Sequence, residues 1–176
     1  VLITFGGTDN NNLSKKILDL ILPDCENNDI KIIIVCGSGY LFKEELVQHV
    51  SHQNYKHIEL VFESSAVSKI MEKSQIAISS NGRTVYELAD MNIPSIIISQ
   101  HKREDTHKFA RLENGFINMG VFRKDKFNLD TLHSFKRLIN DDSFRSSLFQ
   151  SMEKYNFRNN KSKVLGIILS LIEEKK

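Results

Sequence analysis

The sequence lacks several features that would place it in a special class of protein. It has only two prolines in 176 residues, no low-complexity tract and no repeat, so nothing in it predicts a linker between domains. Its longest apolar runs, IKIIIVC and VLGIILSLI, are far shorter than the roughly 20 residues that cross a bilayer. No signal peptide is recognisable at its start. We therefore expect one globular domain over residues 1–176, without a membrane span.

Cysteine is also scarce, and charge of neither sign is in excess. The two cysteines, Cys25 and Cys36, form no CxxC pair, so we expect reduced thiols, as in the cytoplasm, and no disulfide framework. The net charge is +2, and lysines alternate with acidic residues along the chain. This balance describes a solvated surface and gives no support to a nucleic-acid or membrane partner.

The beginning of the chain has a feature of its own. It starts with VLITFGG, without a methionine and with an apolar strand already under way. A natural N-terminus rarely begins inside a core strand. We therefore expect the sequence to be a fragment whose partner domain lies upstream.

What the sequence does contain is a regular alternation of apolar runs with helical patterns. Strands are predicted over 1–5, 30–36, 58–62, 75–79, 94–99 and 116–119. Helices are predicted over 11–22, 41–50, 65–74, 84–91, 103–114, 129–139, 143–155 and 162–174. Runs that are apolar throughout are buried on both faces of a sheet, and strands that alternate with helices run parallel. We predict a Rossmann-like, doubly wound α/β domain with about six parallel strands.

The part of the chain after about residue 129 is predicted to be helical throughout. The last helix has apolar residues at helical spacing: Val164, Ile167, Ile168 and Leu171. We expect this face to pack back onto the domain. The alternative is that it forms an interface with another copy of the chain, as a homo-oligomer would need.

The loops that follow the strands are rich in glycine and small polar residues. These loops are GGTDNN, GSGY, ESSAV, SNGRT and QHKRED, and they hold five of the eight glycines: Gly6, Gly7, Gly37, Gly39 and Gly82. Ligands of doubly wound sheets bind at this edge, glycine lets the backbone approach them, and helix N-termini attract anions. A phosphate-bearing ligand is therefore expected. No P-loop and no GxGxxG occurs, so a nicotinamide or flavin cofactor is not predicted.

Glu87 has two possible roles. Residues 84–87 fit T-x-x-E, a capping box in which Thr84 and Glu87 would close the start of a helix. Alternatively, the Glu87 carboxylate lies one turn into the helix and accepts hydrogen bonds from the ribose hydroxyls of a nucleotide. The residues alone do not decide between these roles.

Catalytic and metal-binding patterns are not evident. The segment HKREDTH has His101, Asp105 and His107, but no Cys/His spacing of the zinc type is present, and we predict no metal. Gln100 and His101, directly after the fifth strand, are better candidates for ligand contact. No GxSxG and no nucleophile–base pair stands out, so no catalytic residue is predicted.

Three motifs together carry a resemblance to a known family. GGTD, SNGRTVYELA and PSIIISQHKRE resemble the C-terminal half of GT-B-type nucleotide-sugar enzymes, over roughly residues 1–125. The nearest resemblance is to the UDP-sugar hydrolase of pseudaminic acid synthesis, with the N-acetylglucosaminyltransferase that makes lipid II more distant. The pattern SNGRTVYE…ISQ…RE.TH also resembles a C-terminal region of CMP-sialic acid synthetase-like proteins.

The resemblance implies which residues would hold the ligand. Near the sugar and phosphates it places Gly6, Gly7 and Thr8, and we add Gly37 from the same edge. It places Phe62 and Val67 beside the uracil. The diphosphate would meet Asn81, Gly82, Arg83 and Thr84 at a helix N-terminus. Glu87 would take the ribose hydroxyls, and Gln100 and His101 would lie near the sugar.

The resemblance also implies a function. The chain would be the donor-binding domain of a nucleotide-sugar hydrolase or glycosyltransferase that serves nonulosonic acid or surface polysaccharide synthesis. A UDP-linked sugar is expected rather than a CMP-linked one. The catalytic base of the hydrolase lies in the N-terminal domain, so this fragment would catalyse nothing alone.

Two positions depart from the family pattern. Asn81 and Arg83 stand where the family often has a glycine or another small residue. Arg83 could add a charged contact to phosphate or block the usual pose of UDP. These departures favour the alternative hypothesis, a non-catalytic accessory or oligomerisation module appended to a cytidylyltransferase.

Overall fold

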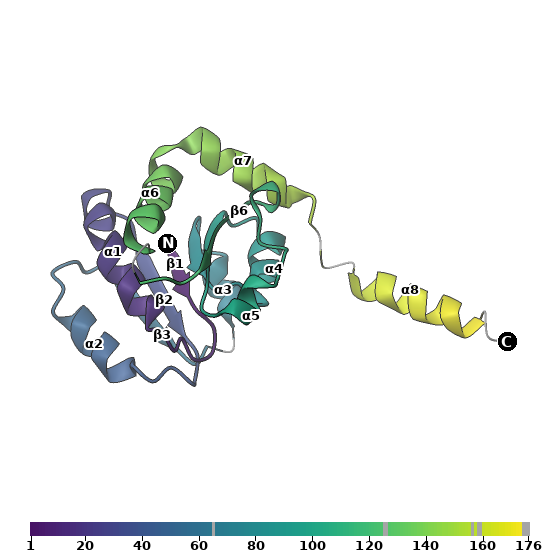
Figure 1. Ribbon diagram of the computed structural model, residues 1–176, viewed down its shortest axis with the longest axis horizontal. Helices are drawn as coiled ribbons and strands as arrows, with labels where there is room; N and C mark the ends of the chain where they lie inside the picture. Colours follow the sequence, from purple (N-terminus) through teal and green to yellow (C-terminus); the bar gives the residue numbers. More distant parts are fainter. Residues whose placement is uncertain (65, 125–126, 156, 158–159, 174–176) are drawn as a thin grey trace.

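One parallel sheet organises the molecule. The computed structural model describes residues 1–64, 66–124, 127–155, 157 and 160–173 (Figure 1). The strands are β1 (Leu2–Thr4), β2 (Ile32–Cys36), β3 (Ile58–Phe62), β4 (Ala77–Ser79), β5 (Ser95–Ser99) and β6 (Phe116–Val121). They pair in the order β3-β2-β1-β4-β5-β6, and every pairing is parallel. The predicted doubly wound sheet of six strands is confirmed.

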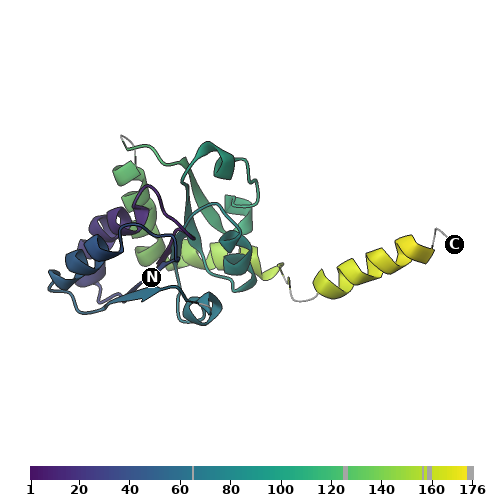
Figure 2. The same ribbon diagram turned by 90° about the horizontal axis from the view of Figure 1, so that it is seen from below.

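Helices cover both faces of this sheet (Figures 1 and 2). They are α1 (Leu13–Asn27), α2 (Lys43–Ser51), α3 (Val67–Met71), α4 (Thr84–Asp90), α5 (Lys102–Asp105), α6 (Phe127–Asn140), α7 (Asp142–Glu153) and α8 (Asn160–Glu173), with a 3-10 turn η1 (Leu112–Asn114). α1, α2 and α6 pack on one face with Ile3, Ile34, Ile78 and Ile96. α3 and α4 pack on the other with Leu2, Ile33, Ala77 and Ile97. Because neighbouring residues of a strand point to opposite faces, apolar runs are needed to fill both cores.

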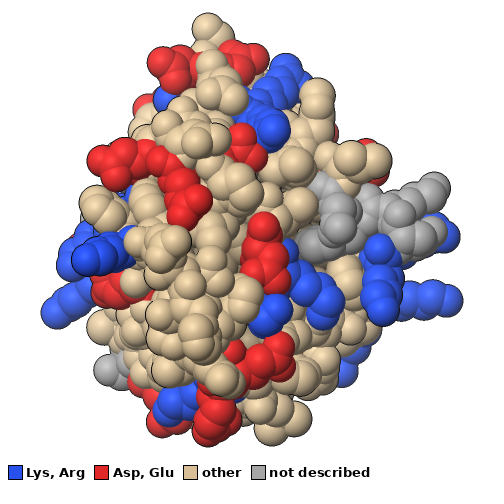
Figure 3. All heavy atoms as spheres, turned by 90° about the vertical axis from the view of Figure 1, so that its left-hand side faces the viewer, with Lys and Arg blue, Asp and Glu red and all other residues tan. Residues whose placement is uncertain are grey.

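The outer surface of α1 and α2 is polar and mixed in sign. Figure 3 looks at this side of the molecule and shows acidic and basic side chains interspersed. Lys15 on α1 pairs with Asp19 at 3.1 Å, and the Asp19 carboxylate also lies 2.5 Å from Nε2 of His49 on α2. This is the solvated surface that the balanced composition predicts.

The predicted helix over 103–114 is wrong. The structure has only the four-residue α5, then an irregular segment, then η1. Three long-range contacts explain the difference. The Asn81 side chain donates to the carbonyls of Glu104 and His107, and Phe109 enters an aromatic cluster with Tyr86. These contacts replace the helical hydrogen bonds that local sequence would favour.

The expectation that the last helix packs back onto the domain is also wrong. α8 projects away from the body (Figures 1 and 2), and its described apolar side chains keep 48–60% of their surface exposed: Val164, Leu165, Ile167, Ile168, Leu171 and Ile172. Before α8, the Phe157 amide donates to Asp90 at 3.0 Å and the Phe157 ring stacks on Tyr155. Among the described helices, none has both the length and the apolar character that a bilayer crossing requires.

Candidate functional site

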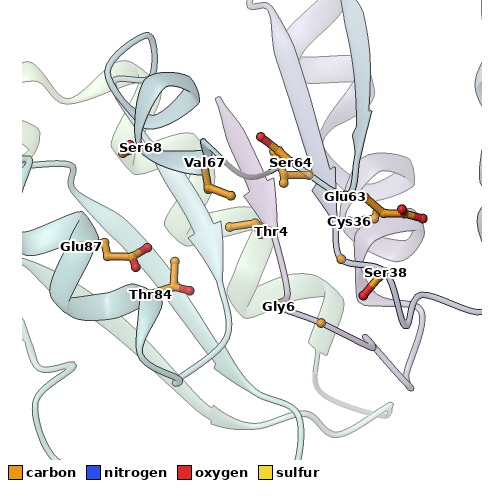
Figure 4. Close-up of a pocket in the computed structure, with 13 residues that line it drawn as sticks. Thr4, Gly6, Cys36, Ser38, Glu63, Ser64, Val67, Ser68, Thr84 and Glu87 are labelled. Carbon is orange, nitrogen blue, oxygen red and sulfur yellow. The ribbon is translucent and has the colours of Figure 1, made fainter.

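A pocket of about 740 Å³ opens at the carboxyl ends of β1, β2, β3 and β4, where the strand order of the sheet reverses. Figure 4 shows the 13 described residues that line it. Thr84 and Glu87 of α4 stand on one side and Ser38 and Glu63 on the other, with Val67 between them. This is where ligands of doubly wound sheets bind, because the flanking loops diverge there.

The loops after β1 and β2 meet backbone to backbone at the base of the pocket. The Gly37 amide donates to the Gly6 carbonyl at 3.3 Å. A Cβ at Gly37 would lie 2.6 Å from Cα of Gly7 and 2.9 Å from its carbonyl oxygen, so only glycine fits there. A Cβ at Gly6 or Gly7 would meet nothing within 4 Å. These two glycines therefore form an open rim that a ligand can approach closely.

The start of α1, beside this rim, is already satisfied by a side chain. Asp9 is buried, and its two carboxylate oxygens accept from the Leu13 and Ser14 amides, each at 2.8 Å. Burial raises the pKa of the Asp9 carboxyl from its ordinary value, against the opposing effect of these amide donors. Because a carboxylate occupies the positive end of the helix, α1 offers no place for an anionic ligand.

The start of α4 is arranged differently. It begins after Arg83 with no side-chain capping hydrogen bond. Thr84 and Glu87 do not reciprocate as a capping box; both line the pocket instead, one helical turn apart. The capping-box alternative is therefore wrong, and the Glu87 carboxylate is exposed at the pocket.

The loops after β4 and β5 are tied by side chains. Asn81 is fully buried, and its Nδ2 donates to the Glu104 carbonyl at 2.9 Å and to the His107 carbonyl at 3.1 Å. Gln100 donates through Nε2 to the Phe5 carbonyl at 2.9 Å, which joins this pair of loops to the end of β1. Side-chain hydrogen bonds thus hold the loops after β4 and β5, whereas the loops after β1 and β2 are held by close backbone packing.

The structure brings about half of the predicted ligand residues into the pocket. Those lining it are Gly6, Gly7, Gly37, Val67, Thr84 and Glu87. Those outside the described lining are Thr8, Phe62, Asn81, Gly82, Arg83, Gln100 and His101. The Phe62 ring lies 4.8 Å from Nζ of Lys43 and packs against the core on the α1 and α2 face. His101 caps α5, where its Nδ1 accepts from the Glu104 amide at 3.3 Å. The ligand roles of both sets stay predictions.

Several lining residues were not predicted: Thr4, Val35, Cys36, Ser38, Glu63, Ser64 and Ser68. All but Ser68 lie within two residues of the carboxyl end of a strand, a rule that could have found them. Glu63 adopts a left-handed backbone with φ of 56°. Burial raises the pKa of the Cys36 thiol to about 11, so it stays protonated at neutral pH.

The charge of the pocket is one-sided. Its described lining holds two carboxylates, Glu63 and Glu87, and no lysine, arginine or histidine. Carboxylates accept hydrogen bonds and suit a ligand rich in hydroxyl groups. Over the described parts of the chain, no group of three or more His, Cys, Asp or Glu side chains is placed to hold a metal ion.

Comparisons with known proteins agree with this architecture. A family model described as the glycosyltransferase family 28 C-terminal domain matches residues 1–129. An uncharacterized protein of Methanocaldococcus jannaschii, MJ1062, is 26% identical over 103 residues, which make up 58% of this chain and 21% of that protein.

Solved structures share the fold. A putative UDP-N-acetylglucosamine 2-epimerase from Listeria monocytogenes has a TM-score of 0.64, with 98% of this chain and 46% of that one covered. The pneumococcal O-GlcNAc transferase GtfA, solved with UDP and GlcNAc, has a TM-score of 0.60, with 97% and 35% covered. Both are 14% identical to this chain, so the likeness concerns the fold, which is that of GT-B C-terminal domains. The chain spans less than half the length of each of these relatives.

Proposed function

The chain belongs to the glycosyltransferase family 28 C-terminal domain, and from this premise we propose that it binds the nucleotide-sugar donor of a larger enzyme. The observation that carries the proposal is the pocket of about 740 Å³ at the strand-order reversal, with glycines on its rim and an exposed glutamate one turn into α4. A nucleotide-sugar needs such a site: an open backbone beside the phosphates and a carboxylate for a vicinal diol.

We place a UDP-linked sugar in the pocket as follows. Glu87 accepts the two ribose hydroxyls, and Val67 lies against the uracil. The diphosphate lies toward Gly82 and Thr84, and Gly6 and Gly7 leave room for the sugar and phosphates. One structural relative supports UDP as the nucleotide, since GtfA was solved with UDP and GlcNAc.

The domain's part in the reaction is to hold the leaving group. Fixing a diphosphate by oriented dipoles stabilises the charge that develops when the sugar departs. The attacking group and its base would come from another domain. We propose that the whole enzyme is a hydrolase or a glycosyltransferase in the synthesis of a nonulosonic acid or a surface polysaccharide sugar.

Calorimetric titration of the 176-residue chain with UDP tests the proposal. We expect saturable binding that weakens by about 1–3 kcal/mol in Glu87→Gln, because the charged acceptor of the diol is lost. Glu44→Gln is the matched control, since Glu44 is an exposed first-turn glutamate on α2, outside the described lining of the pocket. No binding of UDP at millimolar concentration by the folded chain would refute the proposal.

One observation favours a second candidate function, an oligomerisation or accessory module. The described apolar residues of α8 are exposed on a helix that stands away from the body. Light scattering over a range of concentrations tests it. Association that disappears in Ile168→Lys supports the module, and a monomer at every concentration excludes self-association.

A further inference from the structure

Asn81 is a fully buried polar residue in the loop that leads to α4. It lies two residues after the short strand β4, it has no exposed surface, and it is not among the described residues that line the pocket. Burying an amide costs free energy that hydrogen bonds must offset; the Nδ2 group of Asn81 has two partners, whereas its Oδ1 has none within the described structure. The partners of Asn81 therefore indicate its purpose.

Those partners all belong to the segment around α5. One Nδ2 group donates to two carbonyls, Glu104 at 2.9 Å and His107 at 3.1 Å. In return, Nδ1 of His107 lies 2.7 Å from the Asn81 carbonyl; a carbonyl only accepts, so Nδ1 carries the proton. Side chain and backbone of one residue are thus both bonded to the same loop.

The bonding continues from this loop to the end of β1 and the loop that follows it, next to the pocket. The backbone N–H of Gln100 donates to the Glu104 carboxylate at 2.7 Å. The side-chain Nε2 of Gln100 donates to the Phe5 carbonyl at 2.9 Å. Asn11 completes the connection by donating to the Gln100 carbonyl at 3.0 Å. The path runs from the turn before α4, through the α5 segment, to the loop after β1.

We propose that Asn81 is a positioning residue that holds the α5 segment and, through Gln100, the loop after β1 in the geometry that the ligand requires. The inference rests on the proposed function for its ligand. Asn81 touches no ligand in this role; it sets the distance between the two sides of the site. A four-residue helix has too few internal hydrogen bonds to fix itself, so an external clamp is required.

The chemistry explains why asparagine stands here. Two carbonyls need two N–H donors from one short side chain, and the amide of asparagine supplies both. Alanine or glycine would leave the carbonyls without these donors. Serine offers a single donor and should restore part of the bonding.

Hydrogen exchange and UDP titration on the full 176-residue chain test the proposal together. In Asn81→Ala we expect amide exchange over 102–108 to quicken by about tenfold and UDP affinity to fall by a similar factor, as for the loss of one to two buried hydrogen bonds. Asn81→Ser should fall between this variant and the wild type. Asn114→Ala is the matched control, because Asn114 also bonds a backbone carbonyl, that of Phe109, but outside the described pocket lining.

The outcomes separate the two proposals. If the wild type binds UDP and Asn81→Ala binds it equally well, the positioning role is overturned while the proposed function stands. Unchanged exchange over 102–108 in a folded variant overturns the clamp itself. If the wild type does not bind UDP, the proposed function fails, and the positioning role fails with it. Faster exchange and weaker binding in Asn81→Ala, with neither in Asn114→Ala, support the inference.

Discussion

Two helices begin at the edge of the pocket, and they begin in opposite ways. α1 is closed by a buried carboxylate, Asp9, which accepts from two amides of its first turn. α4 starts without a side-chain cap, and the two residues that could have capped it, Thr84 and Glu87, face the pocket. A helix start that the protein satisfies internally is structural, whereas one left open keeps its polar groups for a ligand. We call the loops after β1 and β2, beside the capped start of α1, the closed half of the edge, and the loops after β4 and β5, beside the uncapped start of α4, the open half. The closed half serves the fold, and the open half is left for a ligand.

The closed half should be the less tolerant of substitution. Gly37→Ala places a methyl group 2.6 Å from Cα of Gly7, and this backbone clash should lower the free energy of unfolding by about 2–3 kcal/mol. Gly7→Ala meets nothing within 4 Å and should change it by less than about 0.5 kcal/mol. Urea denaturation of both variants measures the difference. Equal stabilities would mean that the two loops are not packed as described.

The comparison of the helix starts can be tested directly. Asp9→Ala removes both side-chain acceptors from α1 and should cost about 1–2 kcal/mol of unfolding free energy. Thr84→Ala, at the start of α4, should cost less than about 0.5 kcal/mol because no capping bond is lost. Urea denaturation of Asp9→Ala and Thr84→Ala measures both changes in unfolding free energy. A cost for Thr84→Ala as large as that for Asp9→Ala would show that α4 is capped after all.

The smallest changes in stability are expected at the ends of β4 and β5, where some buried serine hydroxyls have no hydrogen-bond partner within the described structure. Ser79 and Ser99 are fully buried, and their hydroxyls make no hydrogen bond within the described structure. Replacing either with alanine should be neutral within about 0.5 kcal/mol or slightly stabilising. Ser95 is equally buried but donates to the Ile93 carbonyl at 2.6 Å, so Ser95→Ala should cost about 1 kcal/mol. Thermal melts resolve this order; a loss for Ser79→Ala as large as that for Ser95→Ala would contradict it.

The sheet was predictable because its signal is local. Apolar runs such as 32–36 and 95–99 are long enough to mark buried strands, and alternation with helices determines that they run parallel. The helix over 103–114 failed for the opposite reason. Its conformation depends on Asn81 and on the aromatic cluster around Phe109, whose partners are distant in the sequence. Helical periodicity cannot report such contacts.

The positions of the candidate site residues were predictable in part, but the directions of their side chains were not. Gly6, Gly37 and Thr84 follow strand ends, so the edge rule found them. Glu63 follows a strand end too, but nothing in its type or spacing set it apart from other exposed acids. The direction of the Asn81 side chain was beyond sequence reasoning, because proximity to a motif does not determine which way a residue turns. The exposed α8 was missed since an apolar pattern predicts burial without naming the partner.

The place of β1 in the sheet has a consequence for how the chain folds. This three-residue strand lies inside the sheet, where Leu2 pairs with Ile33 on one side and with Ala77 on the other. Its second neighbour, β4, follows it in the sequence only after β2, β3 and the helices between them. Closing so long a loop costs entropy before any contact offsets it, so the central pairing is slow relative to the helices around it. Until β4 arrives, one edge of β1 presents unpaired amides and carbonyls, and this interval is when the growing chain is most open to wrong partners.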